Sequence, residues 1–304
     1  MGRQLGAGPV RSRRAVTVYD ALAAPFVEFG FMRRALVACL ALSVGSGPVG
    51  VLLLLRRMSL VGDAMSHAVL PGAAVGFLLG GLSLPAMGSG GMIAGLMVAL
   101  LSGLVSRTTA LREDASFAGF YLTSLAAGVL LVSLRGSSID LLHVLFGTIL
   151  AIDNQALFLI GGIASLTALM LAVVYRPLVA ECFDPGFMQA VGGRGSLYHL
   201  LFLFLVVANL VAGFQALGTL MAVGLMMLPA AAARLWATTL PALAAIAAGV
   251  AFASGYIGLV ASFHLGLASG PSIVLAASVF LIVSILFGRG GMLRRLLQGP
   301  RAAG

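Results

Sequence analysis

The chain has 304 residues, of which 61% are hydrophobic and only 9% are charged. Soluble domains average about 25% charged residues and are less than half apolar, so the composition excludes an ordinary soluble protein. The formal net charge is +9, and all 18 basic residues are arginine. Most of these arginines flank apolar segments, as in the cytoplasmic loops of membrane proteins, so we expect a lipid membrane rather than nucleic acid as partner.

Nine apolar segments follow one another along the chain, and we predict that each forms a transmembrane helix of an all-α, polytopic membrane protein. A count of eight crossings remains an alternative. The segments belong to one permease-sized transmembrane domain at residues 35–288, between a basic and partly interfacial segment at 1–34 and a basic tail at 289–304. In chain order the predicted spans are 35–55, 59–80, 92–105, 117–134, 155–174, 197–212, 215–233, 240–262 and 272–287.

The second predicted span carries an acid and a histidine, Asp63 and His67, inside an otherwise apolar stretch. An ionisable side chain in lipid costs about 3 kcal/mol on insertion scales, so it needs a partner and usually has a function. At positions i and i+4 of a helix the two side chains project from one face, about 6 Å apart. A carboxylate and an imidazole so placed can share one divalent metal ion. A proton path and a purely structural pair are the alternatives.

The same span contains a small-residue series, Gly72, Gly76 and Gly80, which favours close packing against another helix. This stripe lies far around the helix from the acid and the histidine, and Pro71 is expected to kink the helix between them. One chain supplies only two ligands, whereas a closed zinc site usually has about four. A two-fold dimer with this helix at its axis would complete the set, and water molecules are the alternative.

A short apolar segment at 139–150 lies between the fourth and fifth spans and is too short to cross a membrane. We predict a re-entrant or interfacial helix there. Its Asp140 and His143 are spaced i and i+3, which allows a second, outer metal station. We favour the simpler interpretation that they are interfacial polar residues.

The longest polar connection runs from 176 to 196 and contains the signals of a short helix. Asp184 can cap its start, Pro185 suits the first helical position, and Gly192 can end it in a left-handed turn, with Phe183 just before the cap. A docking surface for a partner and a connector lying on the membrane are both consistent with this pattern.

The distribution of arginine predicts the orientation. If nine spans alternate, the arginine-bearing connections lie on one side, and the positive-inside rule makes that side cytoplasmic. The same count places the arginines of the N-terminal segment outside, which conflicts with the rule. The connections on the predicted cytoplasmic side hold Arg56, Arg57, Arg107, Arg112, Arg176, Arg194, Arg234, Arg289, Arg294, Arg295 and Arg301.

No enzyme signature is present. The ATP-binding P-loop requires a lysine, and this chain has none, so any ATP hydrolysis must take place on a separate chain. The chain also lacks the zinc-protease and serine-hydrolase motifs. We therefore expect a transport protein and not an enzyme.

The stretch from Arg56 to Gly72 resembles the signature of the membrane permease of bacterial ABC importers for zinc, manganese or iron. Three later stretches, at 145–150, 183–192 and 218–234, are similar to that family in the same order, and the likeness extends from about 31 to 287. The resemblance implies a homodimer in the bacterial plasma (inner) membrane. It also implies a cytoplasmic ATP-binding subunit that contacts the coupling helix at Phe183, Asp184, Pro185 and Gly192, and an extracytoplasmic solute-binding protein that delivers the metal.

The family's intramembrane metal residues map onto Asp63 and His67. We therefore expect a permease that passes a divalent transition metal inward and holds no permanent cofactor. An oxygen and nitrogen ligand set suits Zn²⁺ and Mn²⁺ alike, and zinc is slightly preferred. The alternative from another class is a proton-coupled secondary transporter or channel that uses the same two residues as a relay.

Overall fold

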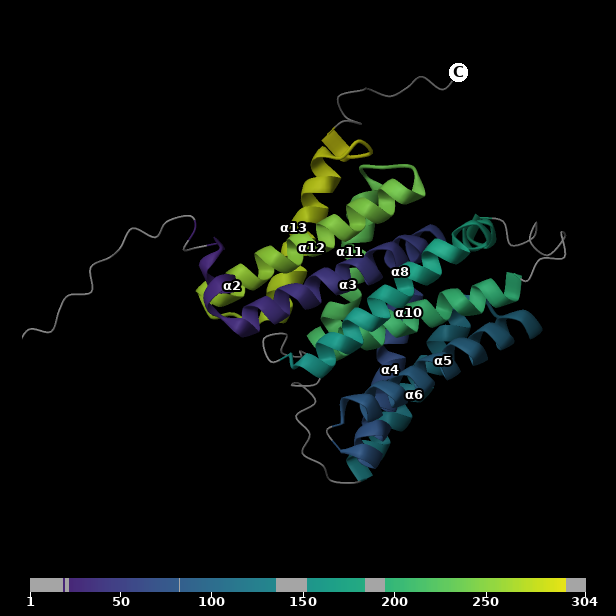
Figure 1. The fold of residues 1–304 in the computed structure, drawn as a ribbon. Coiled ribbons are helices and arrows are strands. Elements are labelled where there is room, and N and C mark those ends of the chain that lie inside the picture. The colour runs from purple at the N-terminus through teal and green to yellow at the C-terminus, as the bar shows by residue number, and fades with distance from the viewer. Residues whose placement is uncertain (1–18, 20–21, 82, 135–151, 184–194, 294–304) are drawn as a thin grey trace, which may run out of the picture.

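The computed structural model describes residue 19 and residues 22–81, 83–134, 152–183 and 195–293. In these residues it contains ten helices and no strand, which confirms the all-α prediction (Figure 1). The helices are α2 (Ala24–Glu28), α3 (Gly30–Leu55), α4 (Ser59–Gly80), α5 (Leu84–Thr108), α6 (Glu113–Leu134), α8 (Asn154–Phe183), α10 (Gly195–Leu217), α11 (Thr219–Arg234), α12 (Leu240–Leu265) and α13 (Ser269–Phe287).

Each of the nine predicted spans coincides with one of the nine long helices. Within the described part of the chain, seven of these helices are long and apolar enough to cross a membrane. The remaining two, α6 and α11, contain shorter apolar stretches, Asp114–Leu130 and Met221–Arg234. The structure therefore supports a polytopic membrane protein with at least seven spans by length and composition.

Three predicted boundaries are wrong. The connection expected at Gly213 and Phe214 lies inside α10, and the chain instead breaks at Gly218, whose φ of 81° is a left-handed conformation that favours glycine. The connection expected at 81–91 is shorter, because α5 already begins at Leu84. Helix α8 continues past Pro177 to Phe183, so it extends further than the predicted span of 155–174.

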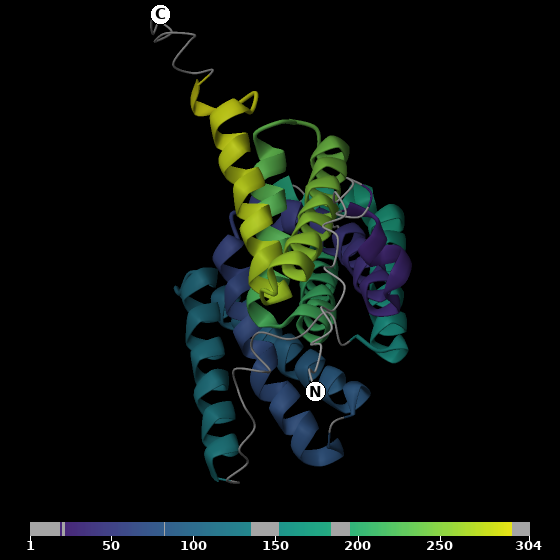
Figure 2. The ribbon, with the colours of Figure 1, turned by 90° about the vertical axis from the view of Figure 1, so that its left-hand side faces the viewer.

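The helices form two groups that pack side by side. Helix α3 lies in the middle of the larger group and contacts α8, α10, α11 and α12. Helices α4, α5 and α6 form a three-helix group, seen below the others in Figure 1 and at the lower left in Figure 2. The main hydrophobic core joins the groups through fully buried residues of α3, α4 and α10, including Leu53, Met65 and Phe202.

The arginine-bearing helix ends gather at one end of the bundle, which we name the arginine end. There the last turn of α3 meets the first turns of α10 through Arg56 and His199. The amide of Gly290, just after α13, donates to the carbonyl of Leu235, just after α11. At the opposite end the ring of Phe29, before α3, packs on a ring of α12. Because α3 starts there, Arg33 and Arg34 in its first turns lie away from the arginine end, as the alternating count predicted.

The packing of α4 on α5 depends on glycines, which confirms the predicted small-residue contact. A Cβ atom at Gly72 would collide with the carbonyl oxygen of Gly90, and one at Gly76 with that of Ala86. The two backbones can approach this closely because α4 presents glycines and α5 presents only Gly90 and the small Ala86 and Ala94 at the contact. Pro71 lies within α4 beside Gly128 of α6, so α4 is held on both flanks.

Replacing Gly76 with leucine should force α4 and α5 apart. We expect Gly76→Leu to destabilise the purified protein by about 1–3 kcal/mol, as overpacking of a tight contact does, and to lower the midpoint of thermal unfolding in detergent. The matched control is Gly119→Leu on α6, where nothing lies within 4 Å of an added Cβ atom. A Gly76→Leu protein as stable as the control would contradict the glycine-mediated contact.

Candidate metal site

The two candidate ligands lie on one face of α4, as the sequence predicted. The Nε2 atom of His67 is 3.9 Å from the Oδ1 atom of Asp63, which is too long for a hydrogen bond. Donor atoms that bind one metal ion at about 2.1 Å lie about 3 to 4 Å apart. The pair is therefore spaced to hold one cation between its two side chains without a change of helix geometry.

The pair faces outward from the single chain. The side chain of Asp63 is 61% exposed and that of His67 is 37% exposed, whereas the neighbouring Ala64, Met65 and Ala68 are buried in the core. Within the described residues no hydrogen bond ties either side chain to a backbone group. Both donor atoms are therefore available to a ligand that approaches this face of α4.

The surroundings of the pair come from α4 itself and from α6. The hydroxyl of Ser66 donates to the backbone carbonyl of Asp63, at 2.7 Å. The imidazole of His67 stacks on the ring of Tyr121, with 6.1 Å between ring centroids. This stacking restricts the ring of His67 while leaving Nε2 directed towards the carboxylate.

The site lies in the half of α4 nearest the arginine end. Asp63 is the fifth residue and His67 the ninth of this 22-residue helix. At 1.5 Å per residue they lie about 6 Å and about 12 Å from its start, along a helix about 33 Å long. The pair therefore lies closer to the arginine end than to the opposite end of the helix.

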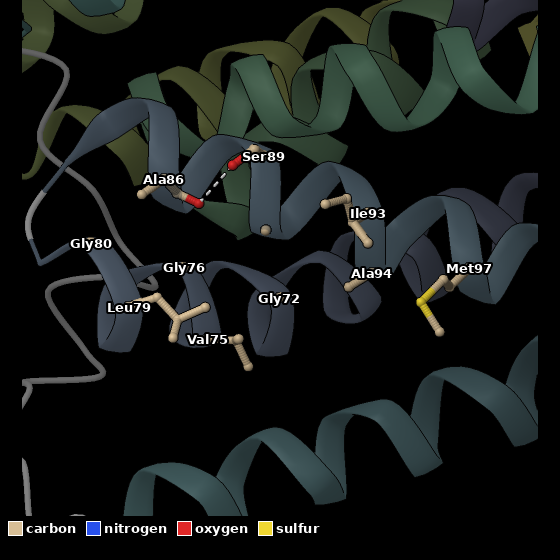
Figure 3. Close-up of a pocket in the computed structure, with 11 residues that line it drawn as sticks. Gly72, Val75, Gly76, Leu79, Gly80, Ala86, Ser89, Ile93, Ala94 and Met97 are labelled. Atoms are coloured by element: carbon tan, nitrogen blue, oxygen red, sulfur yellow. Dashed lines mark hydrogen bonds between the residues drawn. The ribbon is translucent and has the colours of Figure 1, made fainter.

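The described residues of one chain do not complete a metal site. Among the described residues there is no group of three or more histidine, cysteine, aspartate or glutamate side chains. A groove of about 490 Å³ runs along the glycine contact between α4 and α5 and is lined by apolar side chains apart from Ser89 (Figure 3). It offers no metal ligand and is distinct from the exposed pair.

The remaining candidate residues are only partly covered by the structure. Asp140 and His143, the predicted second station, lie outside the described residues, as do Asp184, Pro185 and Gly192 of the predicted coupling helix. Asp153, which follows the short apolar segment, accepts a hydrogen bond from the amide of Ala156 at 2.8 Å and so caps the start of α8.

One polar cluster was not predicted from the sequence. Arg56, at the end of α3, contacts His199 of α10, and Glu181 of α8 is buried beside Gly195 at the start of α10. Because Arg56 and His199 are 143 residues apart in the chain, no local spacing could have paired them.

Comparisons with known proteins agree with this architecture over nearly the whole chain. Residues 28–288 match the model of the ABC 3 transport family. The chain is 34% identical to the manganese import system permease protein ScaB of Streptococcus parasanguinis, covering 84% of this chain and 90% of ScaB. It is 33% identical to the manganese transport system membrane protein MntC of Halalkalibacterium halodurans, covering 91% and 94%.

A solved structure shows the same fold. PsaBC of Streptococcus pneumoniae, in complex with Fab, superposes with a TM-score of 0.80 at 30% identity, covering 90% of this chain and 97% of the matched chain. The apolar helices, the family match and these relatives all describe a multi-pass plasma membrane protein that acts as a transport subunit and not as an enzyme. The chain belongs to the ABC 3 transport family and is a permease subunit of an ABC transporter.

Proposed function

We propose that this permease passes a divalent transition metal ion inward across the plasma membrane, and that Asp63 and His67 bind the ion on its way. The observation that carries the proposal is the outward-facing carboxylate and imidazole on α4, which lie 3.9 Å apart and make no hydrogen bond to a backbone group among the described residues. Membership of the ABC 3 transport family and relatives named for manganese import support it. An ion that leaves water needs such donors to replace its lost hydration.

The energy source in this proposal is a separate ATP-binding subunit on the cytoplasmic side. This chain has no lysine and so no P-loop, and the predicted coupling residues Phe183, Asp184, Pro185 and Gly192 are the proposed contact with that subunit. An extracytoplasmic solute-binding protein delivers the ion at the opposite end. This division of roles makes the proton-coupled secondary transporter the less favoured scheme, because ABC permeases are driven by ATP.

The second copy of the chain completes the metal site in this proposal. The described part of one chain offers a single carboxylate and a single imidazole on this exposed face, whereas divalent zinc prefers about four ligands. A two-fold axis beside α4 would bring two aspartates and two histidines together. The exposed Leu60, on the same face as the pair and 73% exposed, would then lie in the contact between the two copies.

The ligand set is consistent with both Zn²⁺ and Mn²⁺. Oxygen and nitrogen donors without sulfur suit either ion, and zinc was slightly preferred although no residue decides between the two. The names of the ScaB and MntC relatives favour manganese. We therefore propose manganese and zinc as the two candidate cargoes, with transport competition to rank them.

Removing either ligand should impair uptake. We expect Asp63→Ala and His67→Ala each to lower metal uptake by about tenfold or more, since the loss of about 1.4 kcal/mol of binding free energy already costs tenfold in affinity. Uptake is measured in cells at limiting Mn²⁺ or Zn²⁺. Glu28→Ala and His264→Ala, which remove an exposed carboxylate and an exposed imidazole at the end of the bundle opposite the arginine end, are the matched controls. Normal uptake by both ligand variants would refute the role of the pair.

The cargo is ranked by competition. In liposomes that contain the complete transporter, excess unlabelled Mn²⁺ should suppress uptake of labelled Mn²⁺ more strongly than excess Zn²⁺ does if manganese is the cargo. Excess Ca²⁺ should compete with neither, because the pair includes an imidazole and Ca²⁺ takes oxygen ligands. Competition by Ca²⁺ equal to that by Mn²⁺ would contradict a transition-metal site.

A cysteine at Leu60 tests the dimer. If α4 lies at the two-fold axis, Leu60→Cys in native membranes should form a disulfide-linked dimer on mild oxidation. The control is Phe158→Cys on α8, at a side chain that is 82% exposed but belongs to another face of the bundle. Equal cross-linking of both variants, or cross-linking of Phe158→Cys alone, would place the contact between copies elsewhere.

A further inference from the structure

The side chain of Arg56 joins the end of α3 to α10. The Nη1 atom of Arg56, just after α3, lies 2.7 Å from the Nδ1 atom of His199 on α10. Its guanidinium carbon lies 4.5 Å from the centroid of the Phe202 ring, one turn further along α10. A planar guanidinium can make a hydrogen bond at its edge and a cation–π contact on its face at the same time. We name Arg56, His199 and Phe202 the arginine clamp.

The clamp lies immediately before the helix that carries the metal ligands. Only Arg57 and Met58 separate Arg56 from α4. The amides of Arg57 and Met58 donate to the carbonyls of Leu54 and Leu53, which ties this turn to the last residues of α3. A displacement of Arg56 therefore cannot be absorbed by a loose loop and must be passed to the start of α4.

The turn between α3 and α4 also has an unusual backbone conformation. Arg57 has a φ of 59°, and it is the one non-glycine residue with positive φ in the described part of the chain. A left-handed arginine persists only where the surrounding structure fixes it. The position of α4 relative to α3 is thus defined by this turn, and Asp63 follows just over one helical turn into α4.

Through His199 and Phe202 the arginine clamp contacts the first turns of α10. His199 is the fifth residue of α10. The first residue of this helix, Gly195, lies against the buried carboxylate of Glu181 from α8. The chain between α8 and α10 contains the proposed contact with the ATP-binding subunit. The start of α10 is consequently the first described structure that follows this contact along the chain.

We propose that Arg56 is a positioning residue that couples α10 to α4, so that a shift at the start of α10 changes the orientation of Asp63 and His67. This inference rests on the proposed function and deepens it. The path has three steps: α10 carries His199, Arg56 holds His199 and Phe202, and the tight turn passes the displacement of Arg56 to α4. Arg56 itself does not bind the metal, and its role is to join ATP-driven movement to the ligand pair.

The test measures metal transported per ATP hydrolysed by the complete transporter in liposomes, with Mn²⁺ and Zn²⁺ supplied separately. We expect Arg56→Met to lower this ratio by about tenfold, within the range of typical coupling between sites, while the permease still purifies with its ATP-binding subunit. His199→Leu should act similarly, and the double variant should lose little more, because the two residues act as one unit. His199→Asn keeps an acceptor near the Nδ1 position and should retain most of the ratio.

The control is Arg57→Asn, which removes a neighbouring exposed arginine and tolerates the left-handed conformation. A wild-type ratio in Arg56→Met, or additive losses in the double variant, would overturn the coupling role. If Arg56→Met yields no complex, the two His199 variants test the role instead. An equal number of metal ions transported per ATP hydrolysed in His199→Leu and His199→Asn would also overturn it. Failure of the wild-type complex to take up either metal with ATP would instead refute the proposed function itself.

Discussion

The structure depends on one helix that must be tightly packed on one side and polar on another. Helix α4 contacts α5 through Gly72 and Gly76, so closely that the two backbones touch, while Asp63 and His67 face outward. In lipid two unpaired ionisable groups would be costly, and a loosely held helix could rotate to hide them. The glycine contact removes that freedom, because any rotation of α4 would bring side chains into the backbone of α5. The polar face is thus kept exposed by packing elsewhere on the same helix.

The features that follow from local geometry were predictable from the sequence, and those that depend on distant contacts were not. The i, i+4 spacing fixes Asp63 and His67 on one face of any helix, and the Gly72–Gly76 series identifies the packed face before its partner is known. The pairing of Arg56 with His199 depends on how α3 meets α10, which no local pattern encodes. The helix break at Gly218 was misplaced for a similar reason: several glycines lie nearby, and only the fold shows which one takes a positive φ.

The bundle shows where the unevenly distributed arginines lie. The ends of α3 and α11 and the start of α10 meet at the arginine end, whereas α3 begins at the opposite end with Arg33 and Arg34 in its first turns. The positive-inside bias is counted over short connections near the ends of the spans, and charges further along the chain can override those that flank the first span. The larger number of arginines at the arginine end therefore outweighs those at the start of α3 and favours a cytoplasmic location for that end.

Charge balance gives an independent argument for two copies at the proposed site. A divalent ion bound by one Asp63 and one neutral His67 keeps a net charge of +1, and an uncompensated charge in a region of low dielectric constant is strongly disfavoured. A second copy of the pair would bring the net charge to zero while raising the number of donor atoms from two to four. Because Asp63 is more exposed than His67 in the single chain, the carboxylate is the group best placed to reach across a two-fold axis. Neutralisation and ligand number thus both favour the same arrangement of α4 helices.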